Sequence, residues 1–205
     1  MSTGKSRRDQ FSELTRAALL DAATRRFATR GFAGTSLEDV ATDIQATRGA
    51  VYHHFPSKKA LFEAVFEKLE HEAVLLSEEA GARGTNAWES ALLALDAFLT
   101  VCSDPQYGRV VWQEAPIALG WTRWEELEHK FAFGLIEDHV RSLLAGGHIE
   151  PLPLDTMSRI AFAMLGAAGQ ALARAAEGDK ERLRDEYRLV IGRLLAGLIP
   201  AAKSV

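Results

Sequence analysis

Residues 35–61 read TSLEDVATDIQATRGAVYHHFPSKKAL. In this stretch Ser36 can cap the N-terminus of one short helix, and Thr47 can cap a second over residues 48–55. Pro56 ends the second helix, because a residue before proline avoids helical dihedral angles. Helices shorter than about 12 residues are marginal in water, so packing on another helix must stabilise both. The pattern therefore predicts a helix-turn-helix.

The rest of the chain has the apolar spacing of helices and lacks the alternating β-branched runs of strands. A first helix is expected over residues 11–30, and the fourth over residues 57–80. Five more are expected over residues 86–102, 105–119 with an interruption at Pro116, 121–145, 155–177 capped by Asp155, and 179–199 capped by Asp179. We predict an all-α fold of about nine helices, divided into residues 1–56 and residues 57–205.

The composition is that of a globular protein, since 47% of the 205 residues are hydrophobic and 25% are charged. The longest uncharged apolar run, residues 160–173, is shorter than the ~18 residues of a membrane span. No apolar segment follows the basic N-terminus, so we expect no secretory signal, no membrane partner and a cytoplasmic location. The single cysteine, Cys102, excludes an internal disulfide and a cysteine-rich zinc module.

The charge is distributed unevenly along the chain. Residues 1–60 contain ten Lys and Arg against six Asp and Glu, a net charge of +4, and residues 61–205 contain fourteen against twenty-two, a net charge of −8. A basic cluster on a small module is typical of a polyanion partner, although a solvated surface would have the same composition. Lys5, Arg7 and Arg8 either form an arm that follows DNA or belong to a tail without a specific role.

Residues 35–41 and 47–61 resemble the signature of TetR-type (tetracycline-repressor-like) transcriptional regulators, and the similarity covers about residues 11–66. The resemblance implies a homodimer that reads a palindromic operator in double-stranded DNA, with residues 48–55 as the recognition helix. The positions that match the family's DNA contacts are Ser36, Thr47, Arg48, Gly49, Tyr52, His53, His54 and Lys58.

The same resemblance implies what these residues do. Thr47, Arg48 and Gly49 face the major groove, where Arg48 contacts guanine and Gly49 allows a close backbone approach. His53 reaches a base or a phosphate. The expected phosphate contacts are Ser36, Tyr52, His54 and Lys58. The alternative is that Tyr52 and the two histidines only cover the surface of the module.

One position departs from the family pattern. Gln45 occupies the turn position at which the family usually has glycine. Glutamine pays a steric penalty at positive φ that glycine does not pay. We therefore expect a slightly strained or reshaped turn within the same fold.

In the resembling family the last two helices, here residues 155–177 and 179–199, form the dimer interface. Their composition agrees, because residues 160–176 are apolar almost all round and such a helix is buried on more than one side. Small residues such as Gly166 and Gly169 permit close helix packing. The alternative is that these helices build only the core of one chain.

The middle helices are rich in aromatic residues, and the resemblance implies a pocket there for an unknown small-molecule effector. The candidate residues are His71, Phe98, Trp112, Gln113, Glu114, Trp121, Trp124, Phe131 and His139. Core packing is the alternative for each aromatic residue. Effector binding would tilt the fourth helix and change the separation of the two recognition helices, which must be ~34–36 Å on DNA.

The sequence thus predicts a ligand-responsive transcriptional regulator, most simply a repressor that an effector releases from its operator. A DNA-binding helical protein without sequence preference and an enzyme built on a helical bundle are the two alternatives. The local signatures of hydrolytic and metal chemistry are absent from the sequence, so we expect no enzymatic activity, cofactor or metal. Glu125 and His129 lie four residues apart and suit half of a metal site, but a solvated surface pair has the same spacing.

Overall fold

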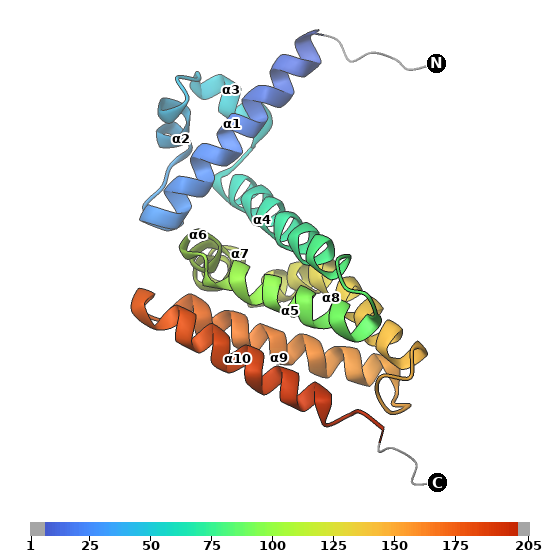
Figure 1. Ribbon diagram of the computed structural model, residues 1–205. Coiled ribbons are helices and arrows are strands. Elements are labelled where there is room, and N and C mark those ends of the chain that lie inside the picture. Colours follow the sequence, from blue (N-terminus) through green and yellow to red (C-terminus); the bar gives the residue numbers. More distant parts are fainter. Residues whose placement is uncertain (1–6, 201–205) are drawn as a thin grey trace, which may run out of the picture.

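The computed structural model describes residues 7–200, with side chains from residue 9 onward. Lys5 and the side chains of Arg7 and Arg8 lie outside the described residues. Every regular element between residues 7 and 200 is helical, which confirms the predicted fold class. None of these helices combines the length and the apolar character that a membrane span requires. Figure 1 shows a small N-terminal group of helices that α4 joins to a larger helical body.

The N-terminal group consists of α1 (Arg7–Arg30), α2 (Leu37–Asp43) and α3 (Arg48–His54). Both predicted caps are present, since the side chain of Ser36 accepts a hydrogen bond from the backbone of Asp39, and that of Thr47 accepts one from Ala50. The buried residues that join the three helices are Leu19, Ala23, Phe27, Leu37, Val40 and Val51. Packing on α1 therefore holds two helices that are too short to be stable alone.

The body contains α4 (Lys58–Gly81), α5 (Ala87–Ser103), α8 (Trp121–Ala145), α9 (Leu154–Arg174) and α10 (Lys180–Ala196). Between α5 and α8 the chain forms α6 (Pro105–Tyr107), the π-helical segment η1 (Gly108–Glu114) and α7 (Ala115–Leu119). A 3₁₀ turn, η2 (Glu177–Asp179), precedes α10. In Figure 1, α9 and α10 run side by side along the edge of the body.

Two predictions about these helices need correction. The stretch over residues 105–119 is not one helix interrupted at Pro116, because Pro116 lies in the first turn of α7, where proline is tolerated, and the irregular part is η1. Neither Asp155 nor Asp179 caps a helix with its side chain. These carboxylates pair instead with arginines of the following turn, Arg159 at 3.0 Å and Arg182 at 2.9 Å.

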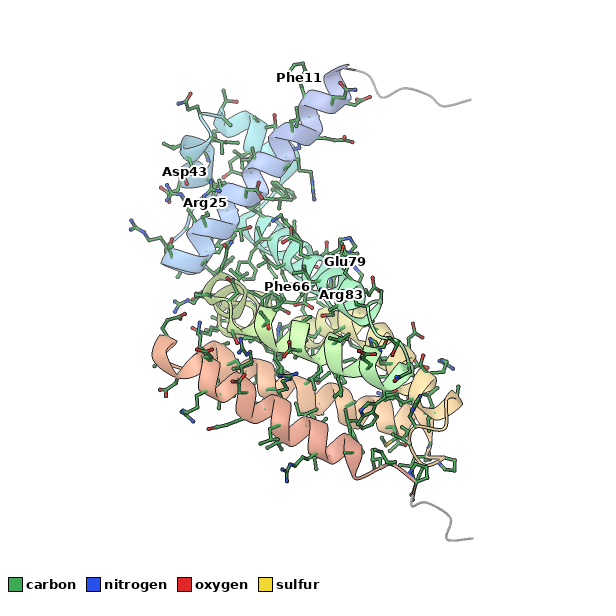
Figure 2. The ribbon with its side chains drawn as sticks, viewed as in Figure 1. Phe11, Arg25, Asp43, Phe66, Glu79 and Arg83 are labelled. Atoms are coloured by element: carbon green, nitrogen blue, oxygen red, sulfur yellow. The ribbon has the colours of Figure 1, made fainter. Side chains whose placement is uncertain are left out.

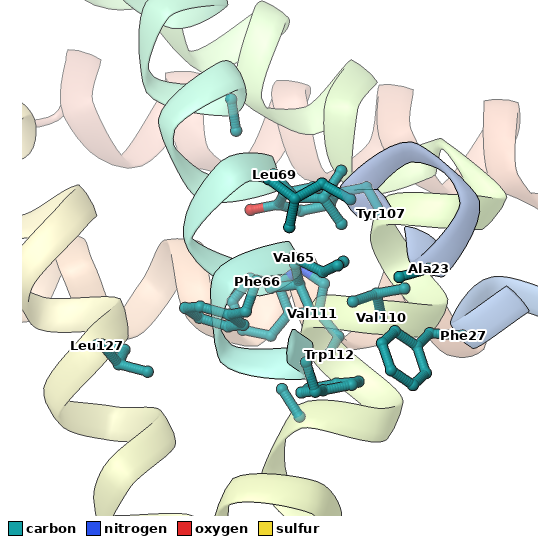
Figure 3. Packing of buried hydrophobic residues seen from close by; sticks show 14 of the residues in the cluster. Ala23, Phe27, Val65, Phe66, Leu69, Tyr107, Val110, Val111, Trp112 and Leu127 are labelled. Atoms are coloured by element: carbon teal, nitrogen blue, oxygen red, sulfur yellow. The ribbon is translucent and has the colours of Figure 1, made fainter. Parts of the chain in front are cut away.

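One hydrophobic core runs from the N-terminal group into the body (Figure 3). Phe27 of α1 packs edge-to-face on Phe62 of α4, with ring centroids 4.9 Å apart. In the close-up, Val110 of η1 lies beside Phe27, and Val65 of α4 lies close to both. Fully burying a side chain of this size contributes roughly 1.5–3 kcal/mol. The residues on either side of position 56 are therefore packed as one unit.

The face formed by α9 and α10 is apolar toward solvent as well as toward the core. Large apolar side chains there are about half exposed, namely Ile160 of α9 and Leu189, Val190 and Leu194 of α10, and Ile199 just after α10 is exposed to a similar extent. On the inner side of the same two helices, Leu172 and Ile191 are buried. A row of exposed large apolar residues on packed helices is typical of a surface that another chain covers.

The turn between α2 and α3 has the positive φ that the sequence indicated. Gln45 has φ 55°, and it is the single non-glycine residue with positive φ in the described part of the chain. Its side chain is exposed. A Cβ atom in this conformation is close to the carbonyl oxygen, which costs about 1–2 kcal/mol.

Replacing Gln45 by glycine is expected to raise the free energy of unfolding by about 1 kcal/mol, because glycine removes the Cβ clash at positive φ. The measurement is urea unfolding followed by circular dichroism. Gln45→Ala is the control, since alanine keeps the Cβ atom and should give no gain. An equal gain from both substitutions would contradict backbone strain at this turn.

Candidate functional site

The exposed surface of α3 is organised around Arg48. This side chain is 71% exposed, and its Nε lies 3.1 Å from Glu38 Oε1. Its guanidinium lies over the ring of Tyr52, 5.2 Å from the centroid, and the Tyr52 hydroxyl donates to the same Glu38 oxygen at 3.4 Å. The carboxylate on α2 therefore orients a cation and an aromatic ring at the start of α3. An arginine presented in this way suits bidentate bonding to a base edge or a phosphate.

Gly49 has no packing role within the protein. A Cβ atom built at this position would meet only Thr47 Oγ1 at 4.0 Å, which is ordinary van der Waals distance. Glycine inside a helix costs roughly 1 kcal/mol relative to alanine. Packing within the protein therefore does not require glycine at position 49. The space next to Gly49, at the N-terminus of α3, is open to solvent.

The histidines that follow differ in exposure. His53 is exposed, whereas His54 is half-buried, and burial together with the charges of His53 and Arg16 lowers the pKa of His54 below its ordinary value. The lowered pKa favours the neutral form of the His54 imidazole at neutral pH. Neutral imidazole carries one donor and one acceptor, so His54 is able to donate to a phosphate without carrying a charge.

Ser36 and Lys58, which were predicted to contact phosphates, both have partners inside the protein. Ser36 Oγ donates to Asp39 Oδ2 at 2.7 Å while it caps α2. Lys58 Nζ donates to the carbonyl of Phe32 at 2.8 Å and lies 4.4 Å from the centroid of its ring. Lys58 therefore fixes the loop that follows α1 to the start of α4.

A cavity of about 330 Å³ opens into the body and is lined by residues of α4, α5, α6, η1, α8, α9 and α10. Five of the nine predicted effector residues are on its wall: Phe98, Trp112, Trp121, Trp124 and His139. Three tryptophan rings pack together there, with centroids 5.8 Å apart for Trp112 and Trp124 and 4.7 Å apart for Trp121 and Trp124. A cavity of this size with aromatic walls is typical of small-molecule sites.

The structure does not place the other four predicted residues on this wall. His71 is exposed to solvent, and Phe131 packs against the hydrophobic core. Gln113 donates its amide to the carbonyl of Ala173 and lines an adjoining pocket, which shares its three tryptophans with the cavity. Glu114 points toward α1. Helical spacing alone did not distinguish side chains that face the cavity from those on the neighbouring faces of η1, α4 and α8.

Two buried glutamates on the wall were missed by the sequence analysis. Glu70 of α4 and Glu128 of α8 are 2% and 6% exposed. A signal was present, because Glu70 falls at helical spacing from Phe66 and Ala73 within the apolar face of α4. Glu128 likewise follows Trp124 by four residues. A carboxylate inside an apolar stripe indicates a buried acid rather than a solvated one.

The two acids perturb each other. Burial raises the pKa of Glu70 to about 7. The Tyr107 hydroxyl donates a hydrogen bond of 2.7 Å to Glu70, and this bond alone would lower the pKa. Burial and the charge of Glu70 raise the pKa of Glu128 well above its ordinary value. Two carboxylates in an apolar cavity cannot both ionise at low cost, so the pair retains a proton near neutral pH.

Three buried polar atoms on the cavity wall lack a hydrogen-bond partner within the described residues: Trp112 Nε1, Glu128 Oε1 and His139 Nε2. Leaving a buried polar group unpaired costs about 1–3 kcal/mol. Because all three atoms line one cavity, a ligand bound there could form hydrogen bonds with them.

Glu125 and His129, the pair with the spacing of half a metal site, lie apart from these atoms in character. Glu125 is exposed, and His129 stacks on Phe133 with ring centroids 4.2 Å apart.

The cavity and the N-terminal group meet at η1. Trp112 reaches into the cavity, and two residues later Glu114 Oε2 accepts a hydrogen bond from the backbone N–H of Phe32 at 2.8 Å. The other oxygen of Glu114 pairs with Arg109 at 2.8 Å. Gly31 leaves room for this carboxylate, since a Cβ atom there would lie 2.8 Å from Glu114 Oε1. η1 thus contacts both parts of the molecule.

Comparisons with known proteins agree with this architecture. Residues 88–198 match the family model described as tetracyclin repressor-like, C-terminal domain, and residues 19–65 match bacterial regulatory proteins, tetR family. The chain is 20% identical over 158 residues to the Transposon Tn10 TetC protein of Escherichia coli, across 76% of this chain and 79% of that protein. It is 42% identical over 63 residues to the regulator TtgR of Pseudomonas putida, across 31% of this chain and 30% of TtgR.

Solved structures extend the likeness to the whole described chain. A TetR-family transcriptional regulator from Pectobacterium atrosepticum superposes with a TM-score of 0.81 at 25% identity, over 97% of this chain and 100% of that one. The regulator FadR from Bacillus subtilis, solved in complex with stearoyl-CoA, has the same fold, with a TM-score of 0.73 at 16% identity over 90% of this chain and 99% of FadR. Because the C-terminal family model alone covers more than half of the chain, the protein belongs to the TetR family of helix-turn-helix transcriptional regulators.

Proposed function

We propose that the protein is a homodimeric repressor that binds a palindromic operator and leaves it when a small molecule occupies the cavity. In this proposal residues 1–56 bind DNA, and residues 57–205 bind the effector and the second chain. The observation that carries the proposal is the position of η1, which contributes Trp112 to the cavity wall and Glu114 to the contact with Phe32. A regulator of the same fold, FadR, was solved with a bound small molecule, which supports a ligand in the body.

On DNA, the N-terminus of α3 would enter the major groove with Arg48 toward guanine. Arg48 would exchange Glu38 for the base edge, and the open space at Gly49 would let the helix come close to the DNA. The proposed contacts are Ser36, Thr47, Arg48, Gly49, Tyr52, His53, His54 and Lys58. Lysine has three N–H donors, so Lys58 retains two for a phosphate beside its bond to Phe32.

The exposed apolar residues of α9 and α10 would pair with the same residues of a second copy. An isologous interface of this kind gives the two-fold symmetry that a palindromic operator requires. Burying about half of each such side chain contributes favourably at roughly 25 cal/mol per Å². A cytoplasmic location is consistent with a DNA partner.

The effector would act through two connections. α4 runs from the N-terminal group to the cavity, where Glu70 and Ala73 line the wall, so a tilt of α4 moves α3. η1 supplies the second connection through Glu114. A coupling free energy of about 1–3 kcal/mol would change operator affinity 5- to 150-fold.

The direct test is selection of bound sequences from random DNA, followed by a screen for compounds that release the protein from the selected duplex. A recovered palindrome and a releasing compound would support the proposal. Equal affinity for all duplexes would support DNA binding without sequence preference, and turnover of a compound without any DNA binding would support an enzyme.

Arg48→Ala is expected to cost about 1–3 kcal/mol of binding at one base position of each half-site and to relax the preference there. The physical reason is the loss of the bidentate contact to guanine. Binding to duplexes with each base at that position is measured by fluorescence anisotropy. Arg83→Ala is the matched control, because Arg83 is exposed just after the C-terminal end of α4, well away from α3 (Figure 2). Uniform weakening on every duplex would rule out base readout by Arg48.

Gly49→Ala is expected to leave folding intact and to lower operator affinity at least about tenfold. The added methyl group meets no protein atom closer than 4.0 Å, and alanine favours the helix by up to about 1 kcal/mol. The loss on DNA follows because the methyl group keeps the backbone of α3 away from the groove. Gly134→Ala is the control, since Gly134 is an exposed helical glycine with nothing within 4 Å. Unchanged operator affinity in Gly49→Ala would contradict a close approach at this position.

Glu114→Ala is expected to reduce the response of operator binding to the releasing compound at least about fivefold, while the compound still binds. The substitution removes the hydrogen bond to Phe32 and the pair with Arg109, but it does not alter the cavity wall. Operator affinity is measured with and without the compound. Glu137→Ala is the control, because Glu137 pairs with Arg141 within α8. A full response in Glu114→Ala would leave α4 as the sole connection.

A further inference from the structure

The charge of the cavity wall is one-sided. Among the described residues that line it are three glutamates, Glu70, Glu125 and Glu128, and neither a lysine nor an arginine. Glu125 is exposed at the edge, whereas the other two lie inside. An anionic ligand would bring a negative charge next to these acids with no cation on this wall to offset it, since Arg174 lines only the adjoining pocket. The wall is therefore electrostatically unsuited to a carboxylate or a phosphate.

The inner acids also have unused bonding capacity. Tyr107 occupies one oxygen of Glu70, and Glu128 Oε1 has no partner although Glu128 is 94% removed from solvent. A positively charged N–H group placed between them would donate to Glu128, would separate the two like charges, and would allow both to ionise. The two acids thus suit a cation better than a neutral hydroxyl. A hydroxyl could donate a hydrogen bond to Glu128, but it would not offset the negative charges of the two carboxylates.

The aromatic rings around the acids favour the same class of ligand. Trp112, Trp121 and Trp124 line the cavity together with Phe98 and Phe162. Tryptophan faces attract cations as well as apolar groups, and they do so more strongly where water is excluded, as at the buried Trp112 and Trp124 but not at the exposed Trp121. These rings would hold both the apolar body and the charged end of a ligand.

Resting on the proposed function, we propose that the effector of this protein is an elongated hydrophobic molecule with a positively charged nitrogen, which binds between Glu70 and Glu128 while its apolar body lies among Trp112, Trp121 and Trp124. His139 follows Glu128 by eleven residues on α8, a distance of roughly 16 Å along the helix. Trp124 precedes Glu128 by four residues, so the unpaired Nε2 of His139 lies on the other side of Glu128 from the tryptophans and is not among the proposed contacts of the ligand.

The test compares three compounds with the same twelve-carbon chain: dodecylamine, dodecanol and dodecanoic acid. Binding to the full chain at pH 7.5, below the micellar concentration, is followed by quenching of tryptophan fluorescence and by calorimetry. The expected order of affinity is the amine first, the alcohol at least about tenfold weaker, and the acid weaker still. An acid or alcohol that binds as tightly as the amine, or a cavity that binds none of the three, would overturn the proposal.

The Glu128→Gln substitution tests whether binding depends on the charge of the carboxylate or only on the shape of the cavity. The amide has nearly the same size, so dodecanol should bind as before while dodecylamine loses at least about tenfold in affinity. Glu126→Gln is the matched control, because Glu126 is exposed on the same helix and pairs with Arg123. Glu70→Gln provides a second variant with the same expectation. An equal loss for amine and alcohol would indicate a packing role and would contradict the charge assignment.

A permanent cation tests the titration of the acids. Glu70 is faced by Cys102 of α5, Tyr107 of α6 and Glu128 of α8, and of these Glu128 is the group that titrates with it. Because burial raises the pKa of Glu70 to about 7, cation binding must release a proton below that pH. The affinity for dodecyltrimethylammonium should therefore rise with pH from 5.5 through 7, by at most about tenfold per pH unit for each proton released. A flat profile would overturn the proposal.

Failure of the proposed cationic ligand and failure of the proposed operator binding would give different results. If dodecylamine binds with the expected charge dependence but no duplex is preferred in the DNA selection, the cavity assignment stands and the operator proposal fails. If an operator is found and dodecanoic acid binds more tightly than the amine, the regulator stands and the cationic assignment fails.

Discussion

The backbone of Phe32 is held from two directions, and the connection between the helix-turn-helix and the body depends on it. Its N–H donates to Glu114 of η1, and its carbonyl accepts from Lys58 at the start of α4, each at 2.8 Å. Its ring packs edge-to-face on Phe62, with centroids 5.3 Å apart. A buried backbone group without a partner is costly, so the loop after α1 cannot separate from η1 or α4 without losing a hydrogen bond. The N-terminal helices therefore follow the movements of both elements.

The sequence predicted the elements whose signals are local. Caps at Ser36 and Thr47 and the long helices of the body follow from side chains and their near neighbours, whereas the positive φ at Gln45 was expected from the family pattern. η1 was not predicted, because a π-helical turn is stabilised by what surrounds it rather than by its own residues. Residues two apart on a helix point to nearly opposite sides, so Trp112 and Glu114 serve different neighbours. Only the packing of α1 against η1 reveals which side each faces.

The cavity was predictable in its aromatic residues but not in its charge. Tryptophans in the middle helices indicated an apolar site. Glu70 and Glu128 each lie within an apolar stripe, but they are separated by more than fifty residues, so the sequence does not show that they face each other. Their proximity, and the pKa shifts that result, arise only when α4 and α8 pack on opposite sides of the same space. Long-range electrostatics of this kind has no local sequence signal.

α9 has two apolar faces, and this links the cavity to the proposed dimer. Phe162 and Leu165 of α9 line the cavity, while Ile160 on the same helix is exposed to solvent. A ligand that displaces α9 from within would therefore move the surface on which a second chain packs. Because close-packed helices shift as rigid units, a small displacement at the cavity would reach the partner through α9 and the recognition helix through η1 and α4. In a two-fold dimer both displacements alter the same quantity, the separation of the two α3 helices.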